Sequence, residues 1–156
     1  MKVIHPLEPI FTKNSKILIL GTMPSVISRQ EKFYYANPQN RFWPVLENIF
    51  HVKLLNYEEK INFLNEKNIA LWDVIESCEI NNSQDSSIKN IKFNDIISLI
   101  NKTNIKIVFC TGKKAYDLFQ KNFSFPCLYL PSPSSANAKL KLNDLIKEYE
   151  IILKFL

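Results

Sequence analysis

The chain has 156 residues, of which 46% are hydrophobic, and a formal net charge of +5. A chain of this length and apolar content can bury a full core, so we expect one domain over residues 1–156. Its only two glycines, Gly21 and Gly112, can form neither a Walker A loop nor a dinucleotide fingerprint, which excludes phosphate binding by a glycine-rich loop.

Hydrophobic periodicity predicts alternating strands and helices. In chain order, we expect a strand at 16–21, a helix at 40–50, a helix from 57 that stops by 68, a strand at 69–74, a helix at 93–100, a strand at 105–110, a helix with Thr111 as candidate N-cap, a strand at 127–130 and a helix at 142–153. The polar segment 79–90 is expected to be a loop. The alternation predicts an α/β fold with a mainly parallel sheet.

The cysteines and histidines argue against a metal site. Three cysteines lie far apart, each in or beside an apolar stretch: Cys78, Cys110 and Cys127. They form no CxxC pair and only His5 and His51 accompany them, so we expect buried, reduced thiols and no cofactor. No signal peptide is recognisable, and no apolar run approaches the roughly 18 residues of a membrane span. We therefore expect a cytoplasmic protein that does not contact membranes.

The carboxyl ends of the predicted strands gather the candidate site residues. Ligands of open parallel sheets bind outside this edge. Gly21 ends the first strand, Asp73 ends the second, Gly112 follows the third, and the segment PSPSSAN at 131–137 follows the fourth. We expect the functional site at this edge, although Gly112 could serve only to turn the strand into the helix.

The segment that is densest in side chains able to bind a ligand is FYYANPQNRFW at 33–43. Aromatic rings stack on nucleobases, and amide side chains can pair with a base edge. Phe42 and Trp43 are expected in the core, whereas at least one of the three aromatic residues at 33–35 is expected to face a ligand. Asn37 and Asn40 are candidates for a turn and an N-cap, a role that does not exclude ligand binding.

Three motifs together resemble the uracil-DNA glycosylase superfamily: GTMPS at 21–25, FYYANPQNRFW at 33–43 and LPSPSSAN at 130–137. The branch that they resemble most is the hypoxanthine-DNA (deoxyinosine) glycosylases, followed by the mismatch-specific uracil glycosylases. Two further segments, 70–79 and 108–116, are similar to the same branch. The resemblance implies a three-layer α/β/α sandwich around a four-stranded, mainly parallel sheet, and a monomer.

The activity that the resemblance implies is that of a monofunctional DNA glycosylase, which initiates base excision repair. Such an enzyme flips a deaminated base out of DNA and hydrolyses its N-glycosidic bond, without a metal or other cofactor. Hypoxanthine is favoured as the target, with uracil and xanthine as alternatives. Charge develops on the sugar and on the departing base as the bond breaks. We therefore expect preorganised hydrogen-bond donors around the base to contribute most of the catalysis.

Residue roles follow from the same resemblance. Tyr35 corresponds to the aromatic residue that stacks on the flipped base, and Asp73 to a base-recognising side chain. Gly21, Met23 and Thr111 are expected to complete the base pocket. Thr111 stands where the branch often has an amide, so purine recognition is expected to differ in this chain.

The segment after the fourth strand corresponds to the loop that grips DNA in this family. Its members are expected to contact the backbone or to fill the gap left by the flipped base: Ser132, Ser134, Ser135, Ala136 and Asn137. Lys139 and Lys141 follow and are candidates for phosphate contacts, unless they are simply solvated.

One position departs from the wider superfamily. Many members carry Asp or Asn at the third position of the first motif, where it positions the attacking water, but this chain has Met23. The deoxyinosine branch typically has an apolar residue there as well. Asn37 is therefore the first candidate for positioning the water and Asn40 the second.

Two functions other than that of a DNA glycosylase are considered for this sequence. A catalytically weak or inactive DNA-binding module on the same fold is favoured by Met23 and by the isoelectric point near 9.1. A serine hydrolase is disfavoured because the chain has no G-x-S-x-G motif and because neither His5 nor His51 looks placed as a base.

Overall fold

The computed structural model describes residues 1–80 and 88–156. Its central sheet has four parallel strands in the order β3-β2-β6-β7. The strands are β2 (Ile17–Gly21), β3 (Ile69–Asp73), β6 (Ile107–Thr111) and β7 (Cys127–Leu130). All four coincide with predicted apolar runs. The register pairs Gly21 with Asp73 and Thr111 with Leu130, so the strand ends form one line across the carboxyl edge.

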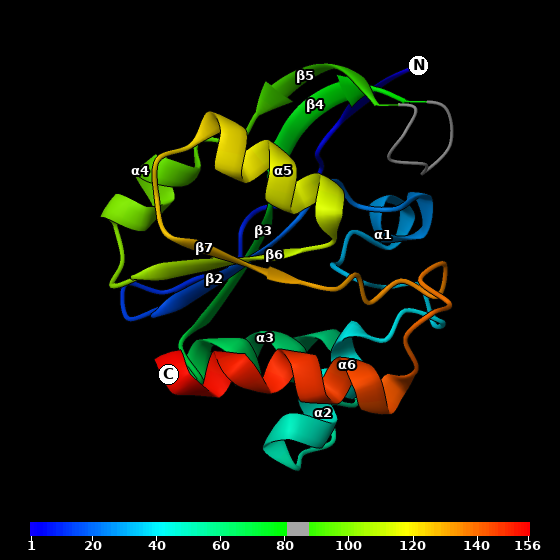
Figure 1. Ribbon diagram of the computed structural model, residues 1–156, viewed down its shortest axis with the longest axis vertical. Coiled ribbons are helices and arrows are strands. Elements are labelled where there is room, and N and C mark those ends of the chain that lie inside the picture. The colour runs from blue at the N-terminus through cyan, green and yellow to red at the C-terminus, as the bar shows by residue number, and fades with distance from the viewer. Residues whose placement is uncertain (81–87) are drawn as a thin grey trace.

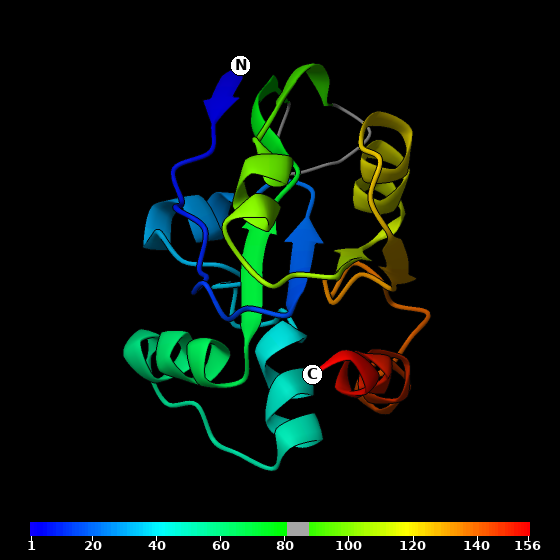
Figure 2. The same ribbon diagram turned by 90° about the vertical axis from the view of Figure 1, so that its left-hand side faces the viewer.

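Helices cover both faces of this sheet (Figures 1 and 2). One face carries α2 (Phe42–Phe50), α3 (Tyr57–Glu66) and α6 (Leu142–Tyr149), which continues into the 3₁₀ helix η2 (Glu150–Phe155). The other face carries α4 (Ile96–Asn101) and α5 (Lys113–Asn122). A short helix that the periodicity did not indicate, α1 (Val26–Glu31), follows β2. The predicted three-layer α/β/α sandwich is confirmed.

A second sheet was not predicted. It is antiparallel, in the order β1-β4-β5, with β1 (Lys2–Ile4), β4 (Ile75–Glu79) and β5 (Lys89–Phe93). Figure 2 shows it on the same side of the central sheet as α4 and α5. Glu79 of the predicted loop 79–90 is therefore in β4 and Lys89 and Asn90 are in β5, whereas residues 81–87 lie outside the described part of the chain. β4 (IESCE) and β5 (KNIKF) mix polar and apolar side chains and so lack the continuous apolar runs by which the central strands were predicted.

Several predicted helix ends were wrong by a few residues. The helix expected at 93–100 begins only at Ile96, because Phe93 belongs to β5. Thr111 is the last residue of β6, so Gly112, with φ of 91°, is the N-cap of α5 instead. The last α-helix ends at Tyr149, where the chain tightens into η2.

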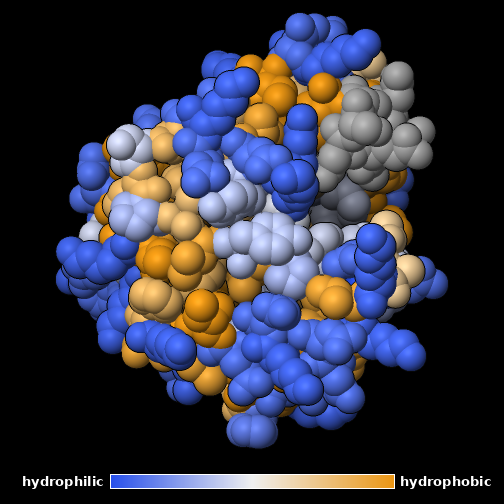
Figure 3. All heavy atoms as spheres, viewed as in Figure 1, coloured by the Kyte–Doolittle hydropathy of each residue, from blue (hydrophilic) through white to orange (hydrophobic). Residues whose placement is uncertain are grey.

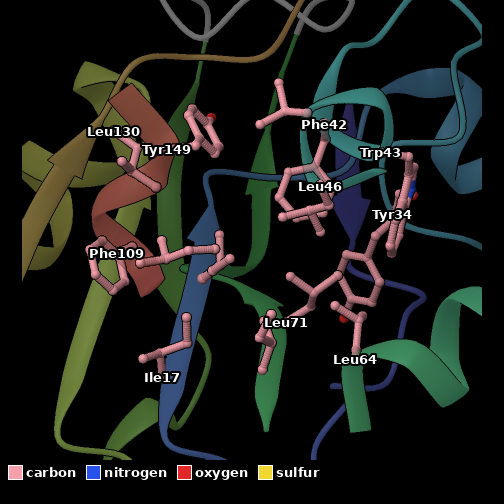
Figure 4. Close-up of a cluster of buried hydrophobic side chains, with 14 of the residues drawn as sticks. Ile17, Tyr34, Phe42, Trp43, Leu46, Leu64, Leu71, Phe109, Leu130 and Tyr149 are labelled. Atoms are coloured by element: carbon pink, nitrogen blue, oxygen red, sulfur yellow. The ribbon is translucent and has the colours of Figure 1, made fainter. Parts of the chain in front are cut away.

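The core has two parts because strand side chains alternate between the faces of the sheet. Figure 4 shows the part under α2, α3 and α6, where Ile17, Leu71 and Phe109 of the sheet meet helical side chains. Phe42 and Trp43 lie in this part, as predicted, with 0% and 5% of their surface exposed. The edge strand β7 is less covered, and Figure 3 shows apolar and weakly polar side chains between the hydrophilic side chains of α5 and α6.

The cysteines follow the expected burial in part. Cys78 and Cys110 are buried and Cys127 is partly exposed, and none of the three is in a disulfide. Burial raises the pKa of the Cys110 thiol, so this thiol keeps its proton. In the described part of the chain, no helix is long and apolar enough to cross a membrane.

Phe42 offers a direct test of the core. Its side chain is fully buried and its ring stacks on that of Tyr35, with 4.0 Å between centroids. We expect Phe42→Ala to lower the free energy of unfolding by about 3–5 kcal/mol, measured by urea denaturation. The control is Leu55→Ala, at a side chain that is 77% exposed, which should change the free energy by less than about 0.5 kcal/mol. Equal effects of the two substitutions would contradict this description of the core.

Candidate functional site

A pocket of about 840 Å³ opens at the carboxyl edge of the central sheet. It brings together most of the residues that the sequence pointed to: Gly21, Met23, Tyr35, Asn37, Asn40, Asp73, Thr111, Ser132, Ser134, Ala136 and Asn137. Ser135 and Lys139 are exposed and are not among its lining residues, and Lys141 is the N-cap of α6. Lys113 and Lys114, which the sequence did not single out, line the pocket at the start of α5.

Asp73 lines this pocket and forms a buried pair with His5, which is not among the lining residues. The His5 Nε2 and Asp73 Oδ2 atoms are 2.7 Å apart, and the two side chains are only 2% and 6% exposed. His5 was considered only as a base of a serine hydrolase, and its pairing with Asp73 was not predicted. His5 directly follows β1, which pairs with β4. Because β4 begins two residues after Asp73, this pairing places His5 beside the end of β3. His51, by contrast, is the C-cap of α2.

The hydrogen bonds around His5 determine where its proton lies. The backbone N–H of Leu7 donates to Nδ1 over 3.2 Å, so Nδ1 carries no proton. A neutral imidazole then has its proton on Nε2, which donates to the Asp73 carboxylate. Because the imidazole is neutral in this arrangement, the pair retains the negative charge of Asp73.

Gly21 is required by the close approach of Asp73. A Cβ atom at this position would overlap Asp73 Oδ1 and would lie 3.3 Å from the Tyr35 hydroxyl oxygen. Since Oδ2 is held by His5, Oδ1 is the oxygen on the Gly21 side. A glycine at the end of β2 thus makes room for a carboxylate oxygen at the floor of the pocket.

Tyr35 is held on one face and at its hydroxyl. One face of its ring stacks on Phe42 at an interplanar angle of 16°. The Thr111 hydroxyl donates to the Leu20 carbonyl over 3.3 Å, so the Tyr35 hydroxyl, 3.2 Å away, donates to Thr111. Burial and the charge of Asp73 raise the pKa of Tyr35, which keeps the hydroxyl neutral.

The other aromatic residues of the segment 33–35 are more buried. Phe33 and Tyr34 are 5% and 4% exposed, and Tyr34 donates its hydroxyl to the Glu8 carbonyl over 2.8 Å. Tyr35, in contrast, is partly exposed and lines the pocket. Tyr35 is therefore the residue of the three that is best placed to face a ligand.

Asn37 makes the predicted turn, whereas the N-cap of α2 is Arg41 and Asn40, predicted as the N-cap, lies one residue before it. Asn37 Oδ1 accepts from the Gln39 N–H and Asn40 Oδ1 accepts from the Phe42 N–H, each over 2.9 Å. Both side chains nevertheless line the pocket. An amide oxygen has two lone pairs, so each can accept a second hydrogen bond from a ligand or water.

Arg41 joins this segment to the loop of residues 131–140. Its guanidinium donates to main-chain carbonyls of that loop: Pro133 (3.3 Å), Ser134 (2.7 Å), Asn137 (2.9 Å) and Leu140. The Tyr149 hydroxyl adds a bond of 2.6 Å to the Pro131 carbonyl. Sequence reasoning missed Arg41 because its partners are backbone atoms, which leave no trace in the sequence.

The polar side chains of the loop 131–140 hold its own backbone. Ser132 Oγ accepts from the Ser134 N–H over 3.2 Å, and Ser134 Oγ accepts from the Ala136 N–H over 3.1 Å. Asn137 returns a hydrogen bond of 3.0 Å to the Ser132 carbonyl. The loop is therefore a defined turn on one wall of the pocket.

The remaining lining residues determine which kinds of group the pocket offers to a ligand. Met23 is partly buried against the apolar cluster under α4 and α5 and carries no hydrogen-bonding group suited to hold water. Within residues 1–80 and 88–156, no three His, Cys, Asp or Glu side chains gather closely enough to hold a metal ion. The polar groups that a ligand meets are thus the carboxylates of Asp73 and Asp117, the ammonium groups of Lys113 and Lys114, hydroxyls, amides and backbone groups.

The role of Arg41 is tested by Arg41→Lys. A lysine ammonium cannot reach carbonyls spread along the loop, so we expect a loss of about 1–3 kcal/mol in the free energy of unfolding and faster amide hydrogen exchange at 131–140. Arg29→Lys is the matched control, because Arg29 donates to a single carbonyl, that of Pro24. Unchanged exchange in the loop would contradict the role of Arg41.

Comparison with known proteins places the chain in a family. The model of the uracil DNA glycosylase superfamily matches residues 8–154. Two curated relatives, from Methanosarcina acetivorans and Methanosarcina barkeri, are named hypoxanthine DNA glycosylase. Each is 32% identical to this chain; the matches cover 86% and 84% of it, and 88% and 86% of the relatives.

A solved structure agrees with these matches. It is a solution structure of a candidate uracil DNA glycosylase from Methanosarcina acetivorans, 30% identical, with a TM-score of 0.83 over 99% of this chain and 98% of the other. The family model begins after β1 and His5, whereas the structural match covers 99% of the chain. The chain therefore belongs to the uracil DNA glycosylase superfamily.

Proposed function

We propose that the pocket receives a deaminated base that is flipped out of DNA, and that hypoxanthine is the favoured base. Membership of the superfamily makes the protein a DNA glycosylase, a hydrolase of N-glycosidic bonds. The observation that supports the choice of base is the Asp73 carboxylate, held by His5 at the floor of the pocket beneath the partly exposed ring of Tyr35. The names of the two Methanosarcina relatives favour the same base.

Asp73 suits the base edge that deamination creates. An ionised carboxylate only accepts hydrogen bonds. Hypoxanthine presents N1–H and uracil presents N3–H beside a carbonyl, whereas their parent bases, adenine and cytosine, carry lone pairs at N1 and N3. Asp73 Oδ1, beside Gly21, would accept the N–H of a deaminated base and repel the lone pair of the normal base.

Tyr35 provides the stacking surface. Its ring is held by Phe42 on one face, which leaves the opposite face for a base, and its hydroxyl is fixed on Thr111. Stacking of a base on an aromatic ring contributes about 1–3 kcal/mol, which offsets part of the cost of flipping. A ring fixed in this way loses little freedom when the base arrives.

Asn37 and Asn40 are the groups we assign to the attacking water. Both line the pocket, and each amide oxygen retains one lone pair beyond its bond to a turn N–H. Neither is a strong base, so stabilisation of the departing base carries most of the catalysis. Met23 is the observation that favours the second candidate function, a DNA-binding module without activity.

The loop 131–140 and the start of α5 are the surfaces we assign to the DNA strand. Ser132, Ser134 and Asn137 line one wall, and Lys113 and Lys114 line the pocket on α5. Ser135, Ala136 and Lys139 are exposed on the loop, where they can reach the DNA. Phosphate contacts of this kind position DNA without reading its sequence. We propose that the protein acts in the cytoplasm as a monomer, without a metal or cofactor.

The activity is tested by strand scission. Duplexes that carry one deoxyinosine, deoxyuridine or deoxyxanthosine are incubated with the protein, and abasic sites are then cleaved with alkali. We expect cleavage at deoxyinosine above all. Salt-dependent binding of all three duplexes without any scission would leave the DNA-binding module as the function.

Asn37→Ala tests the assignment of the water. We expect the single-turnover rate on deoxyinosine to fall by about 10²–10³-fold while DNA binding is retained. Asn62→Ala, at an exposed position on α3, is the control and should leave the rate unchanged. If Asn37→Ala retains the full rate, the first assignment is wrong, and a fall in the rate of folded Asn40→Ala, which also loses the acceptor for the Phe42 N–H, would support the second.

Gly21→Ala tests the floor of the pocket. Because the added methyl group would displace Asp73 and crowd Tyr35, we expect a loss of about 10²-fold in the rate on deoxyinosine. The circular dichroism spectrum should remain that of the folded protein. A variant that is folded and fully active would show that the Asp73 position is not critical.

A further inference from the structure

We propose that His5 is a positioning residue. By holding the Asp73 carboxylate in place through its hydrogen bond, it makes the pocket prefer deaminated purines to uracil. The inference rests on the proposed glycosylase function. Its central claim is that a fixed negative charge at the floor helps a base that departs after gaining a proton, and hinders a base that departs as an anion.

The carboxylate of Asp73 has little freedom to turn away. His5 is bonded at both ring nitrogens, to the Leu7 N–H at 3.2 Å and to Asp73 Oδ2 at 2.7 Å. The Asp73 main-chain carbonyl is also held, by Asn94 Nδ2 at 2.9 Å. With Oδ2 and the backbone fixed, Oδ1 points to the space left by Gly21.

The charge of this carboxylate is not neutralised nearby. Among the described residues, His5 is the only cation-forming side chain within ion-pair distance of Asp73, and its geometry is that of a neutral imidazole. Burial and the charge of Asp73 raise the pKa of Tyr34 and of Tyr35, so both neighbouring hydroxyls stay neutral. Lys113 and Lys114 begin α5 after β6, two strands from β3; Lys113 pairs with Asp117 at 3.5 Å, and among the described residues neither lysine forms an ion pair with Asp73.

Uracil departs in a way that this charge opposes. When the C1′–N1 bond breaks, the electron pair stays on uracil, which becomes an anion; water adds to C1′, and the proton it releases finally neutralises the anion. A carboxylate bonded to N3–H repels the negative charge that develops on the same ring. Asp73 therefore binds neutral uracil but destabilises its departure.

Hypoxanthine has a second route, because its imidazole ring can be protonated. A proton from solvent adds to N7, the C1′–N9 bond breaks with its electron pair returning to the ring, and the base leaves neutral. Water adds to C1′ and returns a proton to solvent, so one water is consumed in total. A carboxylate at N1–H attracts the protonated ring, and the same fixed charge thus accelerates this departure.

The first test compares excision of hypoxanthine and uracil by matched variants. The ratio of single-turnover rates on deoxyinosine and deoxyuridine duplexes is measured for the wild type, Asp73→Asn, His5→Ala and His5→Gln. We expect the ratio to fall about 100-fold in Asp73→Asn, equivalent to about 2.7 kcal/mol, and about tenfold in His5→Ala. His5→Gln keeps an N–H for Asp73 and should stay within about threefold of the wild type.

The second test needs no variant. The wild type is given a duplex containing 7-deaza-2′-deoxyinosine, which keeps N1–H but has a carbon in place of N7. We expect binding like that of deoxyinosine and excision slower by at least about 100-fold. This comparison tests departure through protonated N7 even if excision of uracil is too slow to measure or if a variant does not fold.

The outcomes separate the two claims. Absence of excision of any base by the wild type overturns the proposed function. Rapid excision of hypoxanthine together with an unchanged ratio in folded Asp73→Asn and His5→Ala overturns this inference and leaves the glycosylase intact. Excision of the 7-deaza base at the rate of hypoxanthine overturns it as well.

Discussion

The site depends on one buried contact, the 2.7 Å hydrogen bond between His5 and Asp73. Three parts of the fold must agree for it to form. β1 must pair with β4 to deliver His5, β3 must end at Asp73, and β2 must end in a residue without a side chain. A buried carboxylate without such a partner would be strongly destabilising. The contact therefore ties the small antiparallel sheet to the carboxyl edge of the central sheet.

A second constraint aligns the walls of the pocket with this floor. Arg41 bonds to several carbonyls of the loop 131–140, while the next residue, Phe42, supports the ring of Tyr35. One short segment thus fixes both the stacking surface and the loop proposed to contact DNA. Such preorganisation matters for a glycosylase, because the flipped base must be held in a defined geometry while its bond breaks.

The parts of the fold that could be predicted are those with a local signal. The four central strands are continuous apolar runs, and parallel pairing in register brings Gly21, Asp73 and Thr111 to one edge. The position of His5 could not be predicted, because it lies 68 residues from Asp73 and is delivered by a strand of three residues. Arg41 was missed for a different reason, since its partners are carbonyls that any residue could supply.

The most direct test of the account is a crystal structure of the protein with DNA that contains an abasic site, together with free hypoxanthine. We expect the purine to lie against the ring of Tyr35, with N1 at about 3 Å from Asp73 Oδ1 and with the His5–Asp73 bond intact. A purine bound elsewhere, or bound in this pocket with N1 turned away from Asp73, would contradict the account.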